Sequence, residues 1–252
     1  MAEHIFFVGA GPGDPELITL KGRRLLDQAD VILYAGSLVN PALLDGVRGA
    51  VFDSAGMDLD QIMDIMVTAW QAGQRVVRLH TGDPAIYGAI REQMQRLDEH
   101  GISYQVVPGV SSALAAAAAL PVELTVPEVT QTVIFTRQAG RTPVPEAESL
   151  SRLAAVQASM CIFLSVSMME TVVSALLEGG YVAETPVAVV QRATWPDQRI
   201  IRGTLTDIAA QVSASGICKT AMILVGRALA DDASAVSRLY DAGFSHQYRE
   251  KK

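Results

Sequence analysis

The chain has little of what marks a secreted, membrane-spanning or nucleic-acid-binding protein. It has only two cysteines, Cys161 and Cys218, without metal-ligand spacing, and we expect each in a core strand of a reduced, cytosolic protein. Its longest apolar run, residues 113–120, is far too short to span a bilayer. The first residues include an acid, Glu3, and glycines follow from residue 9, so we expect no signal peptide there. A net charge of −7 disfavours non-specific binding to nucleic acid.

Charged residues are also scarce, at 19% of the chain, whereas 50% of the residues are hydrophobic. That balance is typical of a large core and is compatible with a buried subunit interface. A chain of 252 residues can form one large or two modest α/β domains. A chain of this size buries roughly 70–75% of its unfolded surface, so it needs no disulfides or structural metal.

Residues 8–14 (VGAGPGD) follow an apolar run and hold three glycines and a proline. Such a stretch bends sharply, and after a strand of an α/β protein it lies at the sheet edge where ligands bind. It is not a dinucleotide loop, because Asp14 stands where the third glycine of GxGxxG is required and would repel a pyrophosphate. Pro12 also removes a phosphate-binding N–H. The loop therefore favours a neutral or cationic ligand. The alternative is a tight turn that binds nothing.

The first half alternates short apolar runs with amphipathic segments. Strands are predicted at 4–8, 31–35, 75–80 and 104–107, and helices at 20–29, 58–72, 86–100 and 112–120. Thr19 is a candidate N-cap, Asp58 and Gln61 form a candidate capping box, and Ser111 or Ser112 caps the alanine-rich helix. This alternation predicts an α/β fold with a mainly parallel sheet.

Pro121 and Pro127 then bracket an extended segment, which we interpret as a linker between two α/β domains. The alternation restarts in the second half. Strands are predicted at 132–136, 160–166, 187–190, 199–203 and 221–225. Helices are predicted from the end of a loop at 141–148 to about residue 157, at 170–178 and at 208–212. We therefore expect domains at 1–120 and 121–230, both with mainly parallel sheets, and a C-terminal tail at 231–252 that forms a short helix and a frayed end.

Three strand-end loops of the first half share one character. Each of residues 9–14, 81–84 and 108–112 contains glycine and proline, and the first two contain an aspartate. The carboxyl ends of parallel strands meet at the same sheet edge. The sequence therefore predicts a shaped, acid-lined binding edge.

Four motifs, in order along nearly the whole chain, resemble those of the tetrapyrrole (corrin and porphyrin) methyltransferases. They are GAGPGD with LITLKG at 9–14 and 17–22, TGDPAIYG at 81–88, VPGVSS at 107–112, and VAVVQRATWPDQRIIRGTL at 187–205. Within that family, YAGSLV at 34–39 and SAGM at 54–57 resemble the branch that methylates C11 of precorrin-4 in cobalamin synthesis. The tail motifs at 239–241 and 244–249 are similar to those of related corrin methylases.

One departure separates the chain from the uroporphyrinogen-III branch. Ala35 and Gly36 stand where that branch usually carries an Asp-Arg pair, which also removes an acid that would be a catalytic candidate. The alternatives within the fold are another corrin-ring methylase such as the precorrin-3 C17 enzyme, uroporphyrinogen-III methyltransferase, or a diphthine or ribosomal RNA methylase. Outside it stand a nucleotide-dependent dehydrogenase and a non-catalytic tetrapyrrole carrier.

The resemblance implies a homodimer of two-domain chains, with S-adenosyl-L-methionine bound in the cleft between the domains. Pro12 would lie near the cofactor, and its methionine part would contact Gly82, Asp83, Ile86, Tyr87, Ser111 and Ser112. In the second domain the adenosine contacts would be Ser165, Ala193, Thr220 and Ala221. Ser165 and Ala193 stand where uroporphyrinogen enzymes tend to carry methionine and glycine, so these two would contact the cofactor through backbone atoms.

The implied substrate is a small-molecule tetrapyrrole with many carboxylates, which arginines suit best. Arginine candidates are Arg78, Arg91, Arg137, Arg192 and Arg202, although each could instead be a surface ion-pair residue. We assign substrate contacts to Ser37, Met57 and Arg78. Tyr34, His80 and Asp83 are candidates for the base that removes a proton, and the sequence singles out none of them. His80 fits a satisfied core histidine better than a catalytic one, and no metal, nucleic acid or membrane partner is expected.

Overall fold

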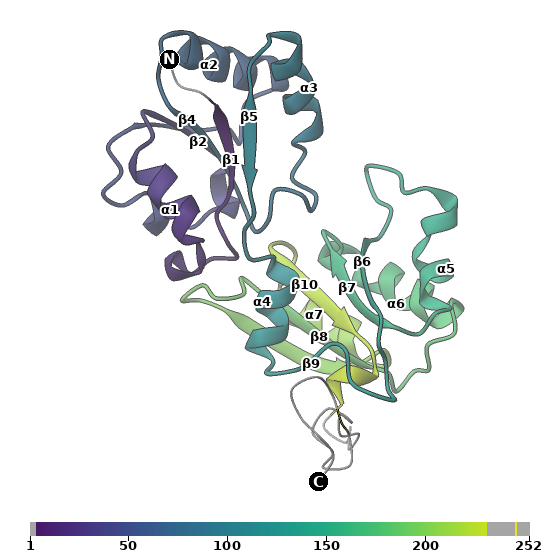
Figure 1. Ribbon diagram of the computed structural model, residues 1–252. Coiled ribbons are helices and arrows are strands. Elements are labelled where there is room, and N and C mark those ends of the chain that lie inside the picture. The colour runs from purple at the N-terminus through teal and green to yellow at the C-terminus, as the bar shows by residue number, and fades with distance from the viewer. Residues whose placement is uncertain (1–3, 231–244, 246–252) are drawn as a thin grey trace. The chain divides into compact units, whose positions relative to one another are not determined.

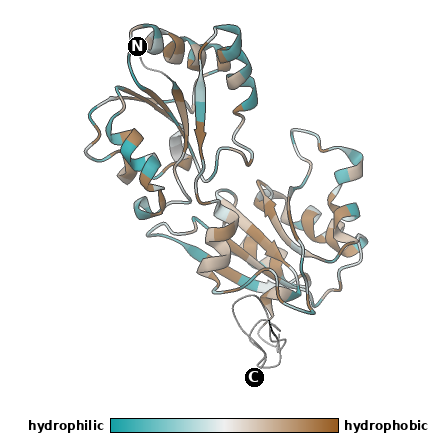
Figure 2. Ribbon diagram, in the orientation of Figure 1, coloured by the Kyte–Doolittle hydropathy of each residue, from teal (hydrophilic) through white to brown (hydrophobic). Residues whose placement is uncertain are grey.

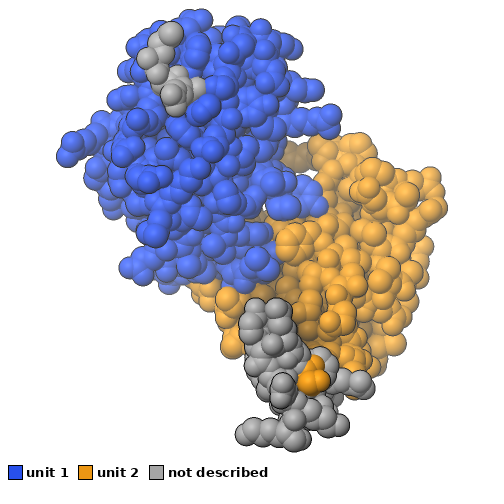
Figure 3. Space-filling model, in the orientation of Figure 1, with its two compact units in different colours: residues 1–115, 192–197 blue, residues 116–191, 198–252 orange. Residues whose placement is uncertain are grey.

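The computed structural model of the chain describes residues 4–230 and 245, so the expected tail and its motifs lie almost wholly outside the described residues. It forms two compact units, one of residues 1–115 with 192–197 and one of residues 116–191 with 198–252 (Figure 3). We expected a division after residue 120; the contacts divide the chain inside the alanine-rich helix α4, Ser112–Ala119. The first unit also includes residues 192–197, which lie between two strands of the second half of the sequence.

The first unit is built on a five-stranded sheet in the order β3-β2-β4-β1-β5 (Figure 1). All four strand pairs are parallel, as the alternation of strands and helices predicted. The strands are β1 Ile5–Gly9, β2 Val31–Tyr34, β3 Ala50–Asp53, β4 Val76–His80 and β5 Tyr104–Val107. The short edge strand β3 was not predicted.

Helices cover both faces of this sheet. Helix α1 (Leu20–Asp27) packs on one face through Leu25 and Leu26, whereas α2 (Leu59–Gln71) and α3 (Arg91–Glu99) pack on the other. Apolar residues of the strands supply both cores, as the brown strands of Figure 2 show. The three central strands, β1, β2 and β4, are therefore buried on both sides, which is usual for an all-parallel sheet.

Local sequence signals account for the helix ends. The Thr19 hydroxyl accepts the backbone N–H of Gly22 at 3.0 Å and caps α1. Asp58 and Gln61 form the predicted capping box at the start of α2. Helix α3 begins at residue 91, so the predicted start at 86 is wrong. The helix starts later than predicted because Tyr87 and Ala89 have left-handed backbones, with φ of 53° and 49°, which an α-helix does not allow.

The second unit contains a mixed five-stranded sheet in the order β6-β7-β10-β8-β9. Its strands are β6 Val133–Arg137, β7 Ser159–Phe163, β8 Pro186–Gln191, β9 Arg199–Thr204 and β10 Ala221–Val225. Only β6 and β7 are parallel, and the other three pairs are antiparallel. The expectation of a mainly parallel sheet is therefore confirmed for the first unit and wrong for the second.

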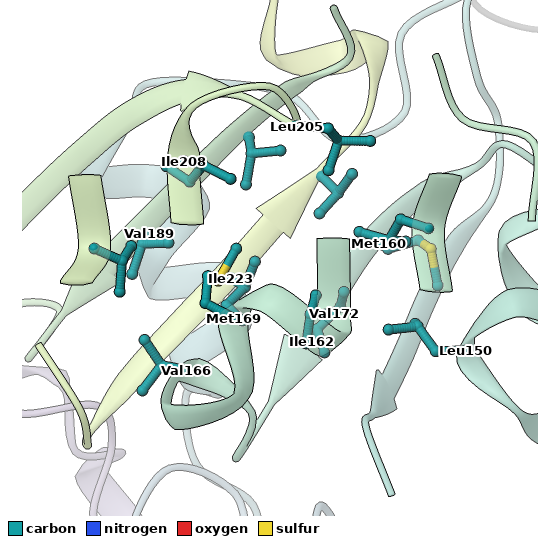
Figure 4. Close-up of a cluster of buried hydrophobic side chains, with 14 of the residues drawn as sticks. Leu150, Met160, Ile162, Val166, Met169, Val172, Val189, Leu205, Ile208 and Ile223 are labelled. Carbon is teal, nitrogen blue, oxygen red and sulfur yellow. The ribbon is translucent and has the colours of Figure 1, made fainter. Parts of the chain in front are cut away.

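Helices α5 (Leu150–Ala154), α6 (Met169–Glu178) and α7 (Ile208–Ser215) pack on one face of the second sheet. Figure 4 shows side chains of α6 and α7, such as Val172 and Ile208, gathered with Met160, Ile162 and Ile223 of the strands. The segment that we interpreted as a linker belongs to this unit, since the Ser159 hydroxyl donates to the Leu124 carbonyl at 2.7 Å.

The two cysteines differ. Cys161 lies in β7 and is buried, as predicted, and burial raises the pKa of its thiol to about 12. Cys218 is exposed and precedes β10, so its predicted place in a core strand is wrong. Among residues 4–230, no helix has the length and apolar character that a bilayer crossing requires.

Candidate active site

The three glycine-proline loops of the first unit meet at the carboxyl edge of the sheet, as predicted. The backbones of Gly11 and Gly82 exchange two hydrogen bonds, of 2.8 and 3.3 Å. Gly9 and Gly109 lie so close that a Cβ on Gly9 would come within 2.6 Å of the Gly109 backbone. Gly9 and Gly109 are needed because the loops touch one another there through their main chains.

The aspartates of these loops do not simply line the edge. One carboxylate oxygen of Asp83 accepts the backbone N–H of Gly109 at 2.9 Å, and the other accepts that of Ala85 at 2.8 Å. Asp14 accepts the N–H of Glu16 at 2.9 Å and caps a short 3-10 helix, η1 (Pro15–Leu17). Each acid therefore satisfies main-chain donors, and Asp83 ties two of the loops together.

After the buried Pro84, the second loop becomes more exposed. Tyr87 is 47% exposed in its left-handed conformation, next to the half-buried Ile86. On the third loop Ser111 is buried, and its hydroxyl accepts the N–H of Ala113 at 3.3 Å at the start of α4. Ser112 is the first residue of that helix. Six predicted cofactor residues thus come from two loops that contact each other: Gly82, Asp83, Ile86, Tyr87, Ser111 and Ser112.

Pro12 is buried, and its carbonyl oxygen accepts the indole N–H of Trp195 at 2.9 Å. Trp195 belongs to residues 192–197, which join the first unit. Ala193 lies in the same stretch and is buried, so the structure groups this predicted second-domain residue with the first unit.

Strand β4, which leads into the second loop, carries two buried polar side chains, Arg78 and His80, which are 5% and 4% exposed. The Arg78 guanidinium donates to Gln93 of α3 at 3.3 Å, and within the described residues its Nη1 has no hydrogen-bond partner. Burial lowers the pKa of Arg78 to about 10. Burial and the nearby Arg78 charge lower the pKa of His80 to about 3. His80 is therefore a buried, neutral histidine, but its Nε2 is unpartnered in residues 4–230, so it is not the satisfied core histidine we expected.

In the second unit, three predicted cofactor residues lie at one end of the sheet. Ser165 follows β7 and is completely buried; its hydroxyl donates to the Phe163 carbonyl at 2.6 Å and accepts the N–H of Gln138 at 2.8 Å. Because β10 is antiparallel to β7, with Ile223 opposite Ile162, the start of β10 lies beside the end of β7. Thr220 and Ala221 are at that start, next to Ser165's loop.

The other candidates for substrate contact are not brought together by the structure, and most of the arginines already have partners in the protein. Ser37 is in the 3-10 helix η2 (Gly36–Leu38), and the half-buried Met57 packs against the core under α2. Arg137 and Arg202 donate to backbone carbonyls, Arg192 pairs with Asp197, and Arg91 is exposed at the start of α3.

The loop edge suits the implied cofactor. Residues 9–14, 81–88 and 108–112 contain no lysine or arginine, so a positively charged sulfonium would meet no like charge from these loops. Gly82 is held by its backbone conformation, because its φ of 60° favours glycine, whereas an added Cβ would make only ordinary contacts with the third loop, the nearest at 3.7 Å. Within the described residues no three acidic, histidine or cysteine side chains gather as a metal site.

Sequence reasoning missed several polar residues of this edge. Gln93 links Arg78 to the backbone by donating to the Ala89 carbonyl at 2.8 Å. Asn40 donates to the Gly13 carbonyl at 2.8 Å. No local pattern reveals such contacts; the one available signal is that Asn40 precedes Pro41, which is typical of a helix start.

Comparisons with known proteins agree with the resemblance found in the motifs. A family model described as Tetrapyrrole (Corrin/Porphyrin) Methylases matches residues 4–209. A cobalt-precorrin-4 C(11)-methyltransferase of Methanocaldococcus jannaschii is 56% identical over 248 residues, which cover 98% of this chain and 96% of the relative. A precorrin-4 C(11)-methyltransferase of Pseudomonas aeruginosa is 52% identical over 246 residues, 97% of this chain and 98% of the relative.

Solved structures give the same result. A cobalt precorrin-4 methyltransferase described as a cobalamin biosynthetic enzyme has a TM-score of 0.88 and 48% identity, covering 90% of this chain and 96% of its own. A uroporphyrin-III C-methyl transferase from Thermus thermophilus, complexed with S-adenyl homocysteine, has a TM-score of 0.75 and 28% identity, covering 90% and 98%.

Proposed function

Because the chain belongs to the tetrapyrrole (corrin/porphyrin) methylase family, we propose that it transfers a methyl group from S-adenosyl-L-methionine to C11 of precorrin-4 or cobalt-precorrin-4, in cobalamin biosynthesis. The observation that carries the proposal is the full-length similarity, at 52–56% identity, to two relatives named for this reaction. Those relatives include one named for the cobalt substrate and one for the metal-free substrate, so the proposal covers both. Any cobalt would be part of the substrate.

The resemblance implies cofactor contacts from residues of each unit. In the first, Pro12, Gly82, Asp83, Ile86, Tyr87, Ser111, Ser112 and Ala193 would contact the cofactor, supported by the meeting of their loops. In the second, Ser165, Thr220 and Ala221 would do so, supported by their common place at the end of β7 and the start of β10.

Bound S-adenosyl-L-methionine supplies a methyl group activated by a positive sulfur. The nucleophile is an electron-rich ring carbon of the substrate, so the chain's own residues mainly bind, orient and exclude water. Orientation of this kind contributes roughly 7–11 kcal/mol in favourable cases. Ser37, Met57 and Arg78 would contact the substrate, and the unpartnered Nη1 of Arg78 supports its part in holding a carboxylate.

The contacts argue against two of the three candidate bases. Both carboxylate oxygens of Asp83 already accept backbone N–H groups. A histidine whose pKa is lowered to about 3 is a weak proton acceptor near neutral pH, which counts against His80. Tyr34, at the end of β2, is the third candidate, and no contact of the described residues singles it out as the base.

The proposal also includes a homodimer in the cytoplasm. Calorimetric titration with S-adenosylhomocysteine, with NAD as the control, tests the cofactor. We expect micromolar binding of one S-adenosylhomocysteine per chain and no binding of NAD. Incubation with S-adenosyl-L-methionine and precorrin-4 should then add one methyl group by mass spectrometry. A folded chain that binds only NAD, or neither compound, would contradict the proposal.

A further inference from the structure

The stretch between β8 and β9, residues 192–197, packs on the turn at residues 12–14. We propose that Trp195 is a positioning residue that sets the conformation of this turn and thereby the affinity for S-adenosyl-L-methionine. The inference rests on the proposed function, because it takes Pro12 and Ala193 to be cofactor contacts. We call residues 192–197 the clasp.

Trp195 contacts the turn in two ways. Its indole N–H donates to the Pro12 carbonyl at 2.9 Å. Its ring lies directly against Gly13, since a Cβ on Gly13 would come within 2.0 Å of the indole Cδ1. A residue larger than glycine at position 13 would therefore displace the ring, and loss of the ring would uncover the turn.

Two more side chains hold the next peptide groups. The Thr194 hydroxyl accepts the N–H of Asp14 at 2.9 Å, and the Asn40 amide donates to the Gly13 carbonyl at 2.8 Å. Three consecutive residues of the turn are thus held by side chains from elsewhere in the sequence. The turn precedes the short helix η1 and belongs to no strand, so these contacts decide its conformation.

Arg192 holds the indole from its own side of the clasp. Its guanidinium carbon lies 5.2 Å from the centre of the Trp195 ring, within the range of a cation–π contact. The same guanidinium pairs with Asp197. This arrangement gives Arg192 a task inside the clasp instead of the substrate contact that was one option for it.

The clasp connects two predicted cofactor residues. It fixes the carbonyl of Pro12 through Trp195, and it contains Ala193 between Arg192 and Thr194, whose left-handed backbones have φ of 48° and 70°. Strained conformations of this kind persist where the surroundings hold them. A change at Trp195 would therefore move both cofactor contacts at once, whereas a purely structural residue would affect only stability.

The test compares Trp195→Phe, which keeps an aromatic ring but loses the N–H donor, with Trp70→Phe. Trp70 is a matched control, because within the described residues its indole N–H has no partner, and it lies on α2. Calorimetry should show the Kd for S-adenosylhomocysteine raised about 3- to 10-fold by Trp195→Phe and unchanged by Trp70→Phe. Hydrogen exchange of the Asp14 amide in the free protein should be faster in Trp195→Phe alone.

The chain has only these two tryptophans, so the Trp70→Phe protein also reports Trp195 fluorescence by itself. Its emission should change on addition of S-adenosylhomocysteine. Equal Kd values for the two variants, or a lower melting temperature of Trp195→Phe with an unchanged Kd, would overturn the proposal. If the folded wild-type chain binds no S-adenosylhomocysteine, the proposed function fails. Unchanged hydrogen exchange of the Asp14 amide in Trp195→Phe would separately refute the claim that Trp195 sets the conformation of the turn.

Discussion

Gly109→Ala should damage the meeting point of the three loops more than any other single methyl group we can identify. The added Cβ would lie 2.2 Å from the Gly82 carbonyl oxygen and 2.8 Å from the Gly9 Cα. Both are backbone atoms at or just beyond strand ends, so no side-chain rotation can relieve the overlap. The loops must separate, or the hydrogen bond from the Gly109 N–H to Asp83 must break.

The magnitude follows from the kind of atoms involved. Overpacking a well-packed site costs typically 1–3 kcal/mol, and contacts with backbone belong at the upper end, so we expect a loss of about 3 kcal/mol in the free energy of unfolding. At about 2–4 °C per kcal/mol for a chain of this size, the melting temperature should fall by roughly 6–12 °C. Binding of S-adenosylhomocysteine should weaken as well, because Gly82 and Asp83 lie on the displaced loop.

Differential scanning calorimetry measures the first effect, with Gly56→Ala as the matched control. Gly56 has no atom within 4 Å of its added Cβ. The control should melt within about 1 °C of the wild type, as most surface substitutions away from special features do. A Gly109→Ala protein that melts with the control, and whose Gly82 amide keeps its protection from hydrogen exchange, would refute the argument that these loops touch through their main chains.

Three further predictions concern buried groups. The unfolded chain binds a proton at His80 near the ordinary pKa of 6.5 and the folded chain only near 3, so stability falls as pH falls through that window. Between pH 7 and pH 5 this loss is about 2 kcal/mol by denaturant unfolding; it should shrink in His80→Gln and persist in the exposed-site control His100→Gln. An alkylating reagent should modify Cys218 in the folded protein and Cys161 only after unfolding, and mass spectrometry that finds both modified at once would contradict the burial of Cys161. Ser165→Ala should lower the free energy of unfolding by about 1 kcal/mol, because the half-buried backbone N–H of Gln138 loses its acceptor; an unchanged free energy of unfolding would disprove that contact.

Much of the first unit could be read from local patterns. The glycine-proline loops after three apolar runs predicted one common sheet edge, since parallel strands bring their carboxyl ends together, and Gly9, Gly11 and Gly82 make contacts at that edge. The capping box at Asp58 was equally local. Such signals depend only on residues a few positions apart, which is why they transfer directly from sequence to structure.

Strand direction in the second sheet could not be read in the same way. A short apolar run that is buried along most of its length, such as β10, has the same appearance in a parallel and an antiparallel sheet. The position of β10 between β7 and β8 depends on packing across the whole unit. The edge strand β3 was missed because its residues are largely exposed and its apolar run, residues 50–52, is only three residues long.

The contacts that shape the candidate site join distant parts of the sequence. Trp195 and Pro12 are 183 positions apart, so no local pattern indicates that they are in contact. The acids were misread for a related reason: sequence shows that Asp83 is at the sheet edge, but not that the Gly109 N–H comes near enough to occupy its carboxylate. Hydrogen bonds between residues that are distant in the sequence depend on the complete fold, so local sequence patterns do not predict them.

The position of the transferred methyl group tests the central claim most directly. The purified chain would be incubated with precorrin-4 and S-adenosyl-L-methionine that carries a carbon-13 methyl group, and the product examined by carbon-13 NMR. The account predicts a single labelled methyl group bonded to C11. A label at another ring position, such as C17, or no transfer by a folded chain that binds S-adenosylhomocysteine, would contradict it.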